Sequence, residues 1–267
     1  MIKVLDTRMG AQTISLFRYL LLGILNLRLF VLVFILVALA LLFSNFITEL
    51  AIINSAQIAQ ALLADFLRYS LVFLTLLLVT TSVAEDYQFR QFERLLTMPV
   101  SRWQYIAAQF LVIATIAAIL CLPVLLVISF STSIEIALYW SAALWLEMLL
   151  LGLLGLLAIL SLEKIPLAVF FSIAIYLLAK LSGLIGQMLT ESVRLSDGST
   201  ANRVTEWIFN GIMHLIPRLD AFAQNDVFFE SLDLVDLLSG QLLTVAIYSL
   251  FLLSVCLMDF YRKEFNL

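Results

Sequence analysis

Long uninterrupted runs of apolar residues, separated by short polar stretches, dominate the hydrophobic pattern of this chain. Six of these runs reach about 20 residues, the length that a helix needs to cross the hydrocarbon core of a bilayer. They cover residues 29–47, 66–84, 105–130, 136–160, 165–185 and 238–258. The runs are continuous and rich in leucine, unlike the short alternating segments of a membrane barrel. Because lipid leaves an open sheet edge without hydrogen-bond partners, the pattern predicts an all-α, polytopic integral membrane protein with six transmembrane helices.

A less regular segment, residues 9–27, precedes the first run. It places Ile14, Phe17, Leu21, Ile24 and Leu25 near one helical face, and polar residues interrupt that face. Such a segment is too polar to span a membrane and too apolar for a free tail. It predicts an N-terminal amphipathic elbow helix that lies in the membrane interface. The alternative is a simple extension of the first span, because helix boundaries are hard to place from sequence.

Composition supports the membrane class and excludes several others. The chain has 267 residues, of which 63% are hydrophobic and 13% charged, with a mean hydropathy of +1.09. Soluble domains average about 45–50% apolar and about 25% charged residues, so a soluble enzyme with this composition would expose large apolar patches. A formal net charge of -4 gives no field for nucleic acid. Cys121 and Cys256 lie in apolar runs without metal-ligand spacing, which is typical of small buried hydrophobic residues.

The basic residues are distributed unevenly between the two sides of the predicted membrane. Of the 15 lysines and arginines, ten fall on the side that holds both termini. The other five are Arg68, Lys180, Arg194, Arg203 and Arg218. The positive-inside rule therefore predicts cytoplasmic N- and C-termini. It also places the acidic segment 186–237 outside the membrane and the connection 85–104 in the cytoplasm.

The cytoplasmic connection between the second and third runs carries the most informative residues. Its charged and aromatic members include Glu85, Phe89, Phe92, Glu93 and Arg94. Phe89, Phe92 and Leu96 share one face of a helix at spacings of three and four residues. Pro99 ends this helix and Ser101 can cap the next one. The residues alone allow two interpretations: a short rigid helix that moves both neighbouring spans when pushed, or an interfacial loop with its arginines on lipid headgroups.

This connection resembles the permease family of type-two ABC exporters. The matching residues are Glu85, Glu93, Leu95, Leu96, Pro99, Ser101 and Arg102. The layout of the whole chain is also similar, with an elbow helix, six spans, a long outer segment before the last span and a short cytoplasmic tail. The resemblance implies an exporter subunit in the bacterial cytoplasmic (inner) membrane. Its partners would be a second permease chain, the same or paralogous, and two copies of a cytoplasmic ABC ATPase subunit.

The resemblance also assigns a role to the cytoplasmic connection. It implies a coupling helix that docks on the ATPase subunit through Glu85, Phe89, Phe92, Glu93, Arg94, Pro99 and Arg102. The sequence contains no G-x-x-x-x-G-K-[ST] motif, so ATP and magnesium would be bound by the partner ATPase, and this chain is expected to bind no cofactor or metal and to have no enzymatic activity of its own. Two alternative functions stay open: an ATP-independent secondary transporter or channel, and a membrane assembly or maturation factor that recruits cytoplasmic partners.

Glu147 is the most informative residue inside the predicted spans. It lies about ten residues into the fourth run, near the middle of the membrane. Charged groups at this depth are costly and usually face a bundle interior or a pathway. Two interpretations have equal weight: a carboxylate in a translocation path or dimer interface, or a protonated or hydrogen-bonded structural residue. Lys180 in the fifth run could approach Glu147, but its position near the outer face favours snorkelling to the interface.

Small residues and prolines give weaker packing signals. Gly152 and Gly155 have a spacing that allows neighbouring helices to approach closely. Pro123 and Pro166 are expected to kink a span or to start one.

Overall fold

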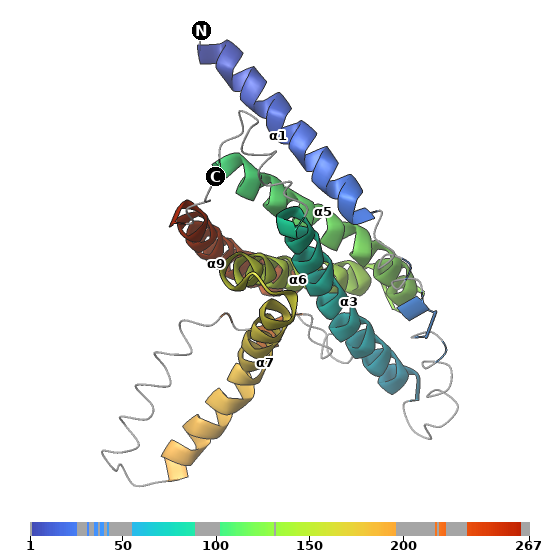
Figure 1. Ribbon diagram of the computed structural model, residues 1–267. Helices are drawn as coiled ribbons and strands as arrows, with labels where there is room; N and C mark the ends of the chain where they lie inside the picture. The colour runs from blue at the N-terminus through green and yellow to red at the C-terminus, as the bar shows by residue number, and fades with distance from the viewer. Residues whose placement is uncertain are drawn as a thin grey trace.

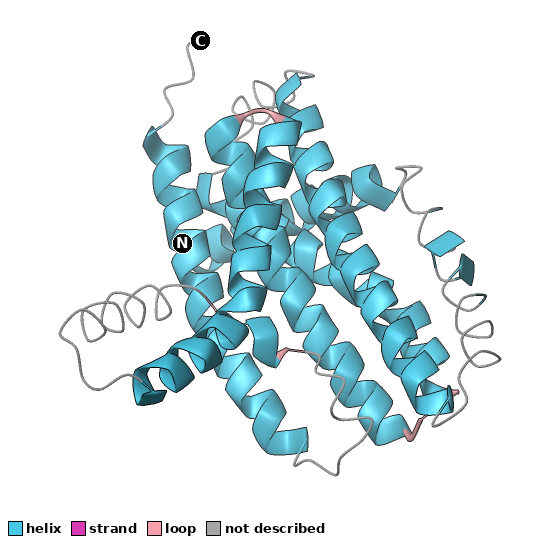
Figure 2. Ribbon diagram, turned by 90° about the horizontal axis from the view of Figure 1, so that it is seen from below, coloured by secondary structure: helices cyan, strands magenta, loops and turns pink. Residues whose placement is uncertain are grey.

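The described part of the chain is entirely helical apart from short turns. The computed structural model describes residues 2–25, 55–88, 102–130, 132–195, 217, 219–222 and 234–262, with isolated helical positions between residues 31 and 42. No strand occurs in these ranges (Figure 2). The all-α prediction is therefore confirmed for this part of the chain. The predicted first span, residues 29–47, lies almost entirely outside the described residues.

Six long helices and one short turn of 3-10 helix make up the described fold. The helices are α1 (Ile2–Leu25), α3 (Ser55–Gln88), α5 (Arg102–Ser129), α6 (Ile134–Leu162), α7 (Ile165–Leu195) and α9 (Leu234–Arg262), and the 3-10 turn is η1 (Leu219–Ala221). Five stretches are long and apolar enough to cross a membrane: Gln60–Glu85, Trp103–Ser129, Ile134–Leu162, Ile165–Ser182 and Leu234–Arg262. They coincide with the second to sixth predicted spans. The helix lengths and composition are those of a multi-pass membrane protein.

Helix α6 is the centre of the bundle. It packs against α3, α5, α7 and α9, which surround it in Figure 1. Of its apolar span, 83% is buried inside the protein, against 22% for α9. A helix that is apolar on all sides must be enclosed by other helices or by lipid. The surrounding helices enclose α6, so its side chains can be reached from outside only between its neighbours.

The outer helices turn large apolar side chains away from the bundle. Phe170 on α7 is 72% exposed and Leu250 on α9 is 67% exposed. Other exposed members of these two faces are Leu167, Phe171, Leu177, Leu178, Leu181, Val235, Leu242, Leu243, Ile247, Phe251 and Met258. Soluble proteins rarely expose apolar area on this scale, whereas hydrocarbon chains are as apolar as leucine. These faces therefore have the chemistry of a lipid-contacting surface.

Helix α1 packs along α5, on the side away from the centre of the bundle (Figure 1). It buries Leu16, Leu20 and Ile24, which recur every four residues and so form one stripe. Ile14, on the predicted apolar face, is 62% exposed, and the interfacial position of this helix stays a prediction. The helix also begins at Ile2, before the predicted start at residue 9. The position of α5 determines which residues of α1 are buried, and the sequence of α1 alone does not specify them.

Several helices extend beyond the apolar runs that predicted them. Helix α3 begins at Ser55, before the predicted start of its span at residue 66. Helix α7 continues to Leu195, past the predicted end of its span at residue 185. These extensions are more polar than the spans, and a search based on apolar length does not detect them.

The connection between α6 and α7 is a tight turn. Glu163 has a φ of 58° and its backbone N–H donates to the carbonyl of Ile159 at 3.0 Å, which closes the end of α6. Pro166 follows as the second residue of α7, a position at which proline loses no helical hydrogen bond. Pro123, by contrast, lies inside α5, and the helix continues to Ser129. The prediction that these prolines start or interrupt spans is confirmed for Pro166.

The two glycines of α6 lie where neighbouring helices approach most closely. A Cβ atom added to Gly152 would lie 2.5 Å from Ile113 Cγ2 on α5, and one added to Gly155 would lie 2.6 Å from Leu76 Cδ1 on α3. Real Cβ atoms essentially never come this close, so a side chain at either position would force the neighbouring side chain to shift. The predicted role of Gly152 and Gly155 in close helix packing is confirmed.

Replacing Gly152 with alanine is expected to destabilise the bundle by about 1–3 kcal/mol, the usual cost of overpacking. Gly155→Ala should cost less, because Leu76 Cδ1 is the end of a flexible side chain, whereas Ile113 Cγ2 is attached directly to Cβ. The midpoint of thermal unfolding, followed by tryptophan fluorescence in detergent, measures both effects. Ile113→Ala should relieve part of the cost in the Gly152→Ala background. Strictly additive effects of these two changes would show that no clash is relieved.

Candidate functional site

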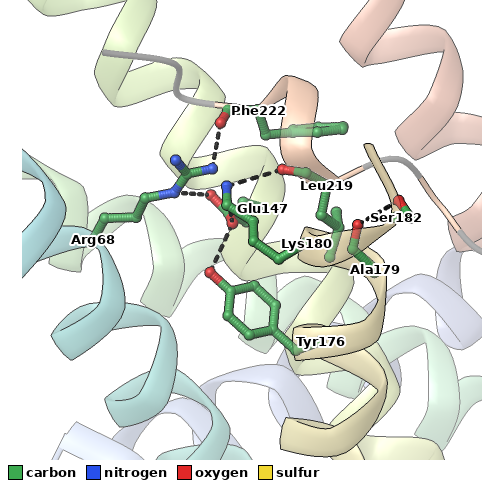
Figure 3. Close-up of polar contacts among 8 residues, drawn as sticks. All are labelled: Arg68, Glu147, Tyr176, Ala179, Lys180, Ser182, Leu219 and Phe222. Atoms are coloured by element: carbon green, nitrogen blue, oxygen red, sulfur yellow. Dashed lines mark hydrogen bonds and ion pairs between the residues drawn. The ribbon is translucent and has the colours of Figure 1, made fainter. Parts of the chain in front are cut away.

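Three helices bring charged side chains together inside the bundle (Figure 3). Arg68 comes from α3, Glu147 from α6 and Lys180 from α7. The Nε atom of Arg68 donates to Glu147 Oε2 at 2.7 Å. The Nζ atom of Lys180 lies 3.6 Å from Glu147 Oε1. Glu147 is completely buried and Arg68 is 3% exposed, so this ion pair has almost no access to solvent or lipid headgroups.

A tyrosine completes the coordination of the carboxylate. The hydroxyl of Tyr176, one turn before Lys180 on α7, donates to Glu147 Oε1 at 2.9 Å. Each oxygen of Glu147 therefore accepts a hydrogen bond, one from a guanidinium and one from a phenol. Hydrogen bonds to ionised groups are roughly twice as strong as those between neutral groups. The carboxylate thus links α3 and α7 through the central helix.

Each of the two cations also donates to a backbone carbonyl of residues 219–222, which comprise η1 and the residue after it. Lys180 Nζ donates to the carbonyl of Leu219 at 3.0 Å. Arg68 Nη2 donates to the carbonyl of Phe222. Asp220 lies between these two carbonyls and interacts electrostatically with Lys180. We define the buried charge cluster as Arg68, Glu147, Tyr176, Lys180 and residues 219–222; it contains two cations and two carboxylates.

Burial of the charge cluster carries a desolvation penalty, and removal of one of its charges costs stability as well. Moving an ion pair out of water carries a desolvation penalty that often cancels its electrostatic gain. Removal of one partner, however, leaves the other as an isolated buried charge, which costs about 3–5 kcal/mol. The cluster therefore makes the arrangement of α3, α6, α7 and η1 specific, whatever its net contribution to stability.

The structure bears on two sequence-predicted residues. Glu147 is hydrogen-bonded and buried within this chain, and its place in a translocation path or dimer interface stays a prediction. Lys180 does not snorkel; its side chain, 16% exposed, turns inward to Glu147 and Leu219. The prediction was wrong because the interior offers Lys180 a carboxylate and a carbonyl within the reach of its stem.

Arg68 is the residue that the sequence-based prediction missed. Arg68 was counted among the basic residues outside the membrane, although it lies inside the span Gln60–Glu85. The signal was nevertheless present, since an arginine inside an apolar helix needs an acidic or carbonyl partner. Glu147, in another predicted span, was a candidate for that partner.

Most of the predicted coupling segment lies outside the described residues. Glu85 is exposed near the end of α3, and Arg102 is the first residue of α5. Phe89, Phe92, Glu93, Arg94 and Pro99 belong to the undescribed stretch between these helices. The assignment of this segment therefore stays a prediction.

Other polar side chains tie the bundle together by single hydrogen bonds. Trp145 Nε1 on α6 donates to the carbonyl of Ala114 on α5 at 2.9 Å. Gln241 Nε2 on α9 donates to the hydroxyl of Tyr139 on α6, also at 2.9 Å. Within the described ranges, no group of three or more His, Cys, Asp or Glu residues is arranged to hold a metal ion. Cys121 and Cys256 are free and buried, as predicted for small hydrophobic residues.

No protein-family model matches the chain, and no curated protein is similar enough to match it. The functional conclusion therefore depends on the residues and on their arrangement.

Replacement of Arg68 by methionine should destabilise the protein by about 3 kcal/mol or more, because it leaves the Glu147 carboxylate without its closest cation. Tyr176→Phe should cost less, about 1.5–3 kcal/mol, since it removes one hydrogen bond to a charged group. Unfolding in detergent titrated with sodium dodecyl sulfate measures both values. In the Arg68→Met background, Glu147→Leu should recover part of the loss. A double variant as unstable as the sum of its single variants would show that the pair is not coupled.

Proposed function

We propose that this chain is the membrane-spanning permease subunit of an ABC exporter in the bacterial inner membrane. It has cytoplasmic termini, pairs with a second permease chain and transports its substrate with ATP hydrolysed by a separate ATPase subunit. The protein contributes the membrane path and the mechanical connection, and its partner contributes the ATPase chemistry.

One observation carries this proposal: the residues that resemble the family's coupling segment join α3 to α5. Both helices pack against the central helix α6 and against each other. A force applied between residue 85 and residue 102 would therefore act on two of the four helices that surround α6. A connection between helices at the margin of the bundle would lack this leverage.

Helix α3 also provides a rigid link from that segment to the charge cluster. Glu85 and Arg68 lie on the same uninterrupted helix, Ser55–Gln88. Their separation of 17 residues corresponds to about 25 Å at the rise of an α-helix. Tilting the cytoplasmic end of α3 would thus displace Arg68 relative to Glu147. Helix α1, packed on α5, gives the ATPase a second element to contact.

The proposed orientation gains support from the positions of two basic residues. Arg68 and Lys180 had been counted on the outer side, but both belong to the charge cluster inside the bundle. Only Arg194, Arg203 and Arg218 then stay on that side, against ten basic residues on the side of the termini. The asymmetry that the positive-inside rule uses is therefore larger than the sequence count indicated.

An ATP-independent secondary transporter is the second candidate. Its supporting observation is Glu147, a carboxylate at the middle of α6 that neighbours two cations and a phenol. Intramembrane carboxylates in such surroundings serve proton relays in pumps and transporters. Export from vesicles driven by a proton gradient, with no need for ATP, would favour this candidate over the ABC permease.

The double variant Phe92→Ala with Glu93→Ala tests the proposal. It should lose co-purification with the ATPase subunit encoded or expressed beside it, because it removes an aromatic anchor and a charge from the docking segment. Affinity purification from detergent-solubilised membranes, followed by mass spectrometry and an ATPase assay, measures the loss. The matched control is Phe251→Ala with Asp236→Ala, which also removes one phenylalanine and one acidic residue, here from exposed positions on α9. Full retention of coupled ATPase activity in the Phe92–Glu93 variant would refute the coupling role.

A further inference from the structure

Residues 219–222 meet the bundle in a different way from the long helices. The helices pack through side chains along their length, whereas this short segment offers two backbone carbonyls to cations of α3 and α7. Its apolar side chains are also enclosed: Leu219 is 4% exposed and Phe222 is 1% exposed. The segment is therefore inserted into the protein and does not lie over its surface.

The insertion reaches the level of the candidate membrane spans. Glu147 lies 13 residues after Ile134 and 15 before Leu162, so it is about 20 Å from either end of α6. Arg68 lies eight residues after Gln60, or about 12 Å along its span. Non-helical backbone at such depth is tolerated only where protein or water satisfies its polar groups. Arg68 and Lys180 supply the donors that the carbonyls of residues 222 and 219 require.

Two backbone hydrogen bonds form within the segment. The N–H of Leu219 donates to the carbonyl of Pro217 at 2.9 Å, and the N–H of Phe222 donates to the carbonyl of Leu219 at 3.3 Å. Among the described residues, the carbonyls of residues 219 and 222, the two buried side chains and the interaction of Asp220 with Lys180 connect it to the bundle. A short segment that is separate from the long helices is the kind of unit that opens locally before the helices separate.

We propose that residues 219–222 are a re-entrant latch that closes the bundle over Glu147 and detaches as a unit while the helices stay packed. Arg68 and Lys180 hold the latch through the carbonyls of Phe222 and Leu219. When the latch is closed, Asp220 brings a second carboxylate near Lys180. When it opens, Asp220 and both carbonyls leave, and the two cations face Glu147 alone. Water then enters the vacated space to solvate them, so opening of the latch controls access to Glu147.

The latch does not depend on the proposed transport function, because it follows from contacts within this chain. It assigns Arg68 and Lys180 a double role: each interacts with Glu147, and each holds a carbonyl of the inserted turn.

Hydrogen–deuterium exchange of the full-length protein in lipid nanodiscs tests the latch. Lys180→Met keeps the length and apolar character of the stem but removes the donor to Leu219. Peptides that contain residues 219–222 should then exchange roughly tenfold faster or more, the factor expected when one hydrogen bond from a charged group is lost. Peptides from α6 should exchange at the wild-type rate. The matched control, Gln241→Leu, removes a buried hydrogen bond to Tyr139 outside the cluster and should leave residues 219–222 protected.

Chemical labelling of Glu147 gives a second, independent readout. A water-soluble carbodiimide with an amine nucleophile should modify Glu147 slowly in the wild type, where the carboxylate is completely buried. Lys180→Met should increase modification several-fold, and Gln241→Leu should not, as measured by mass spectrometry of the α6 peptide. This readout uses the folded protein and needs no substrate or ATPase.

Faster exchange confined to residues 219–222, together with greater labelling of Glu147, would support the latch. Unchanged exchange of residues 219–222 in Lys180→Met would overturn it. Equal acceleration in the α6 peptides would also overturn it, because the cluster would then hold the whole bundle and not a detachable segment. Arg68→Lys, which keeps the charge but has fewer donors, should give the same local pattern if Lys180→Met disturbs folding.

Discussion

The pairing of Glu147 with Arg68 is the interaction on which the rest of this structure depends. A carboxylate at the middle of the most enclosed helix can exist only if other helices bring donors to it, because the apolar surroundings offer none. Arg68 from α3 and Tyr176 from α7 supply hydrogen bonds, and Lys180 supplies a second positive charge. The requirement of one side chain thus sets the relative position of three helices. The same donors extend to residues 219–222 and connect this short segment to the centre of the bundle.

Close packing around α6 provides the second constraint. Gly152 and Gly155 let α5 and α3 approach α6 more closely than any side chain would allow. These contacts lie one to two turns beyond Glu147 on the same helix, so the electrostatic and the steric contacts act on the same pair α3–α6. Association in lipid relies on such packing and on hydrogen bonds, since burial of apolar area gives little advantage where the solvent is itself apolar. A movement of α3 would therefore have to change both sets of contacts together.

Much of the fold followed from simple patterns. The apolar runs predicted five of the long helices. A membrane span needs a continuous apolar segment, and a helix satisfies the backbone hydrogen bonds of that segment internally. The role of the glycines in α6 and the burial of Cys121 and Cys256 were also correctly predicted. Which side of α1 packs on the protein was not predictable, since Ile14 is as apolar as the buried Leu16 and only the position of α5 distinguishes them. Lys180 and Arg68 were misplaced because each was judged from its distance to the end of its own helix.

The sequence by itself determined that this is a helical protein with long apolar spans and that Glu147 lies deep inside one of them. These properties depend on residues near one another in the chain, so their spacing is visible without a fold. The tertiary structure alone decided which helix lies at the centre, which cations meet the carboxylate, and that residues 219–222 insert beside them. Arg68 and Phe222 are 154 positions apart, and only the packing of the helices brings such distant groups within hydrogen-bonding distance.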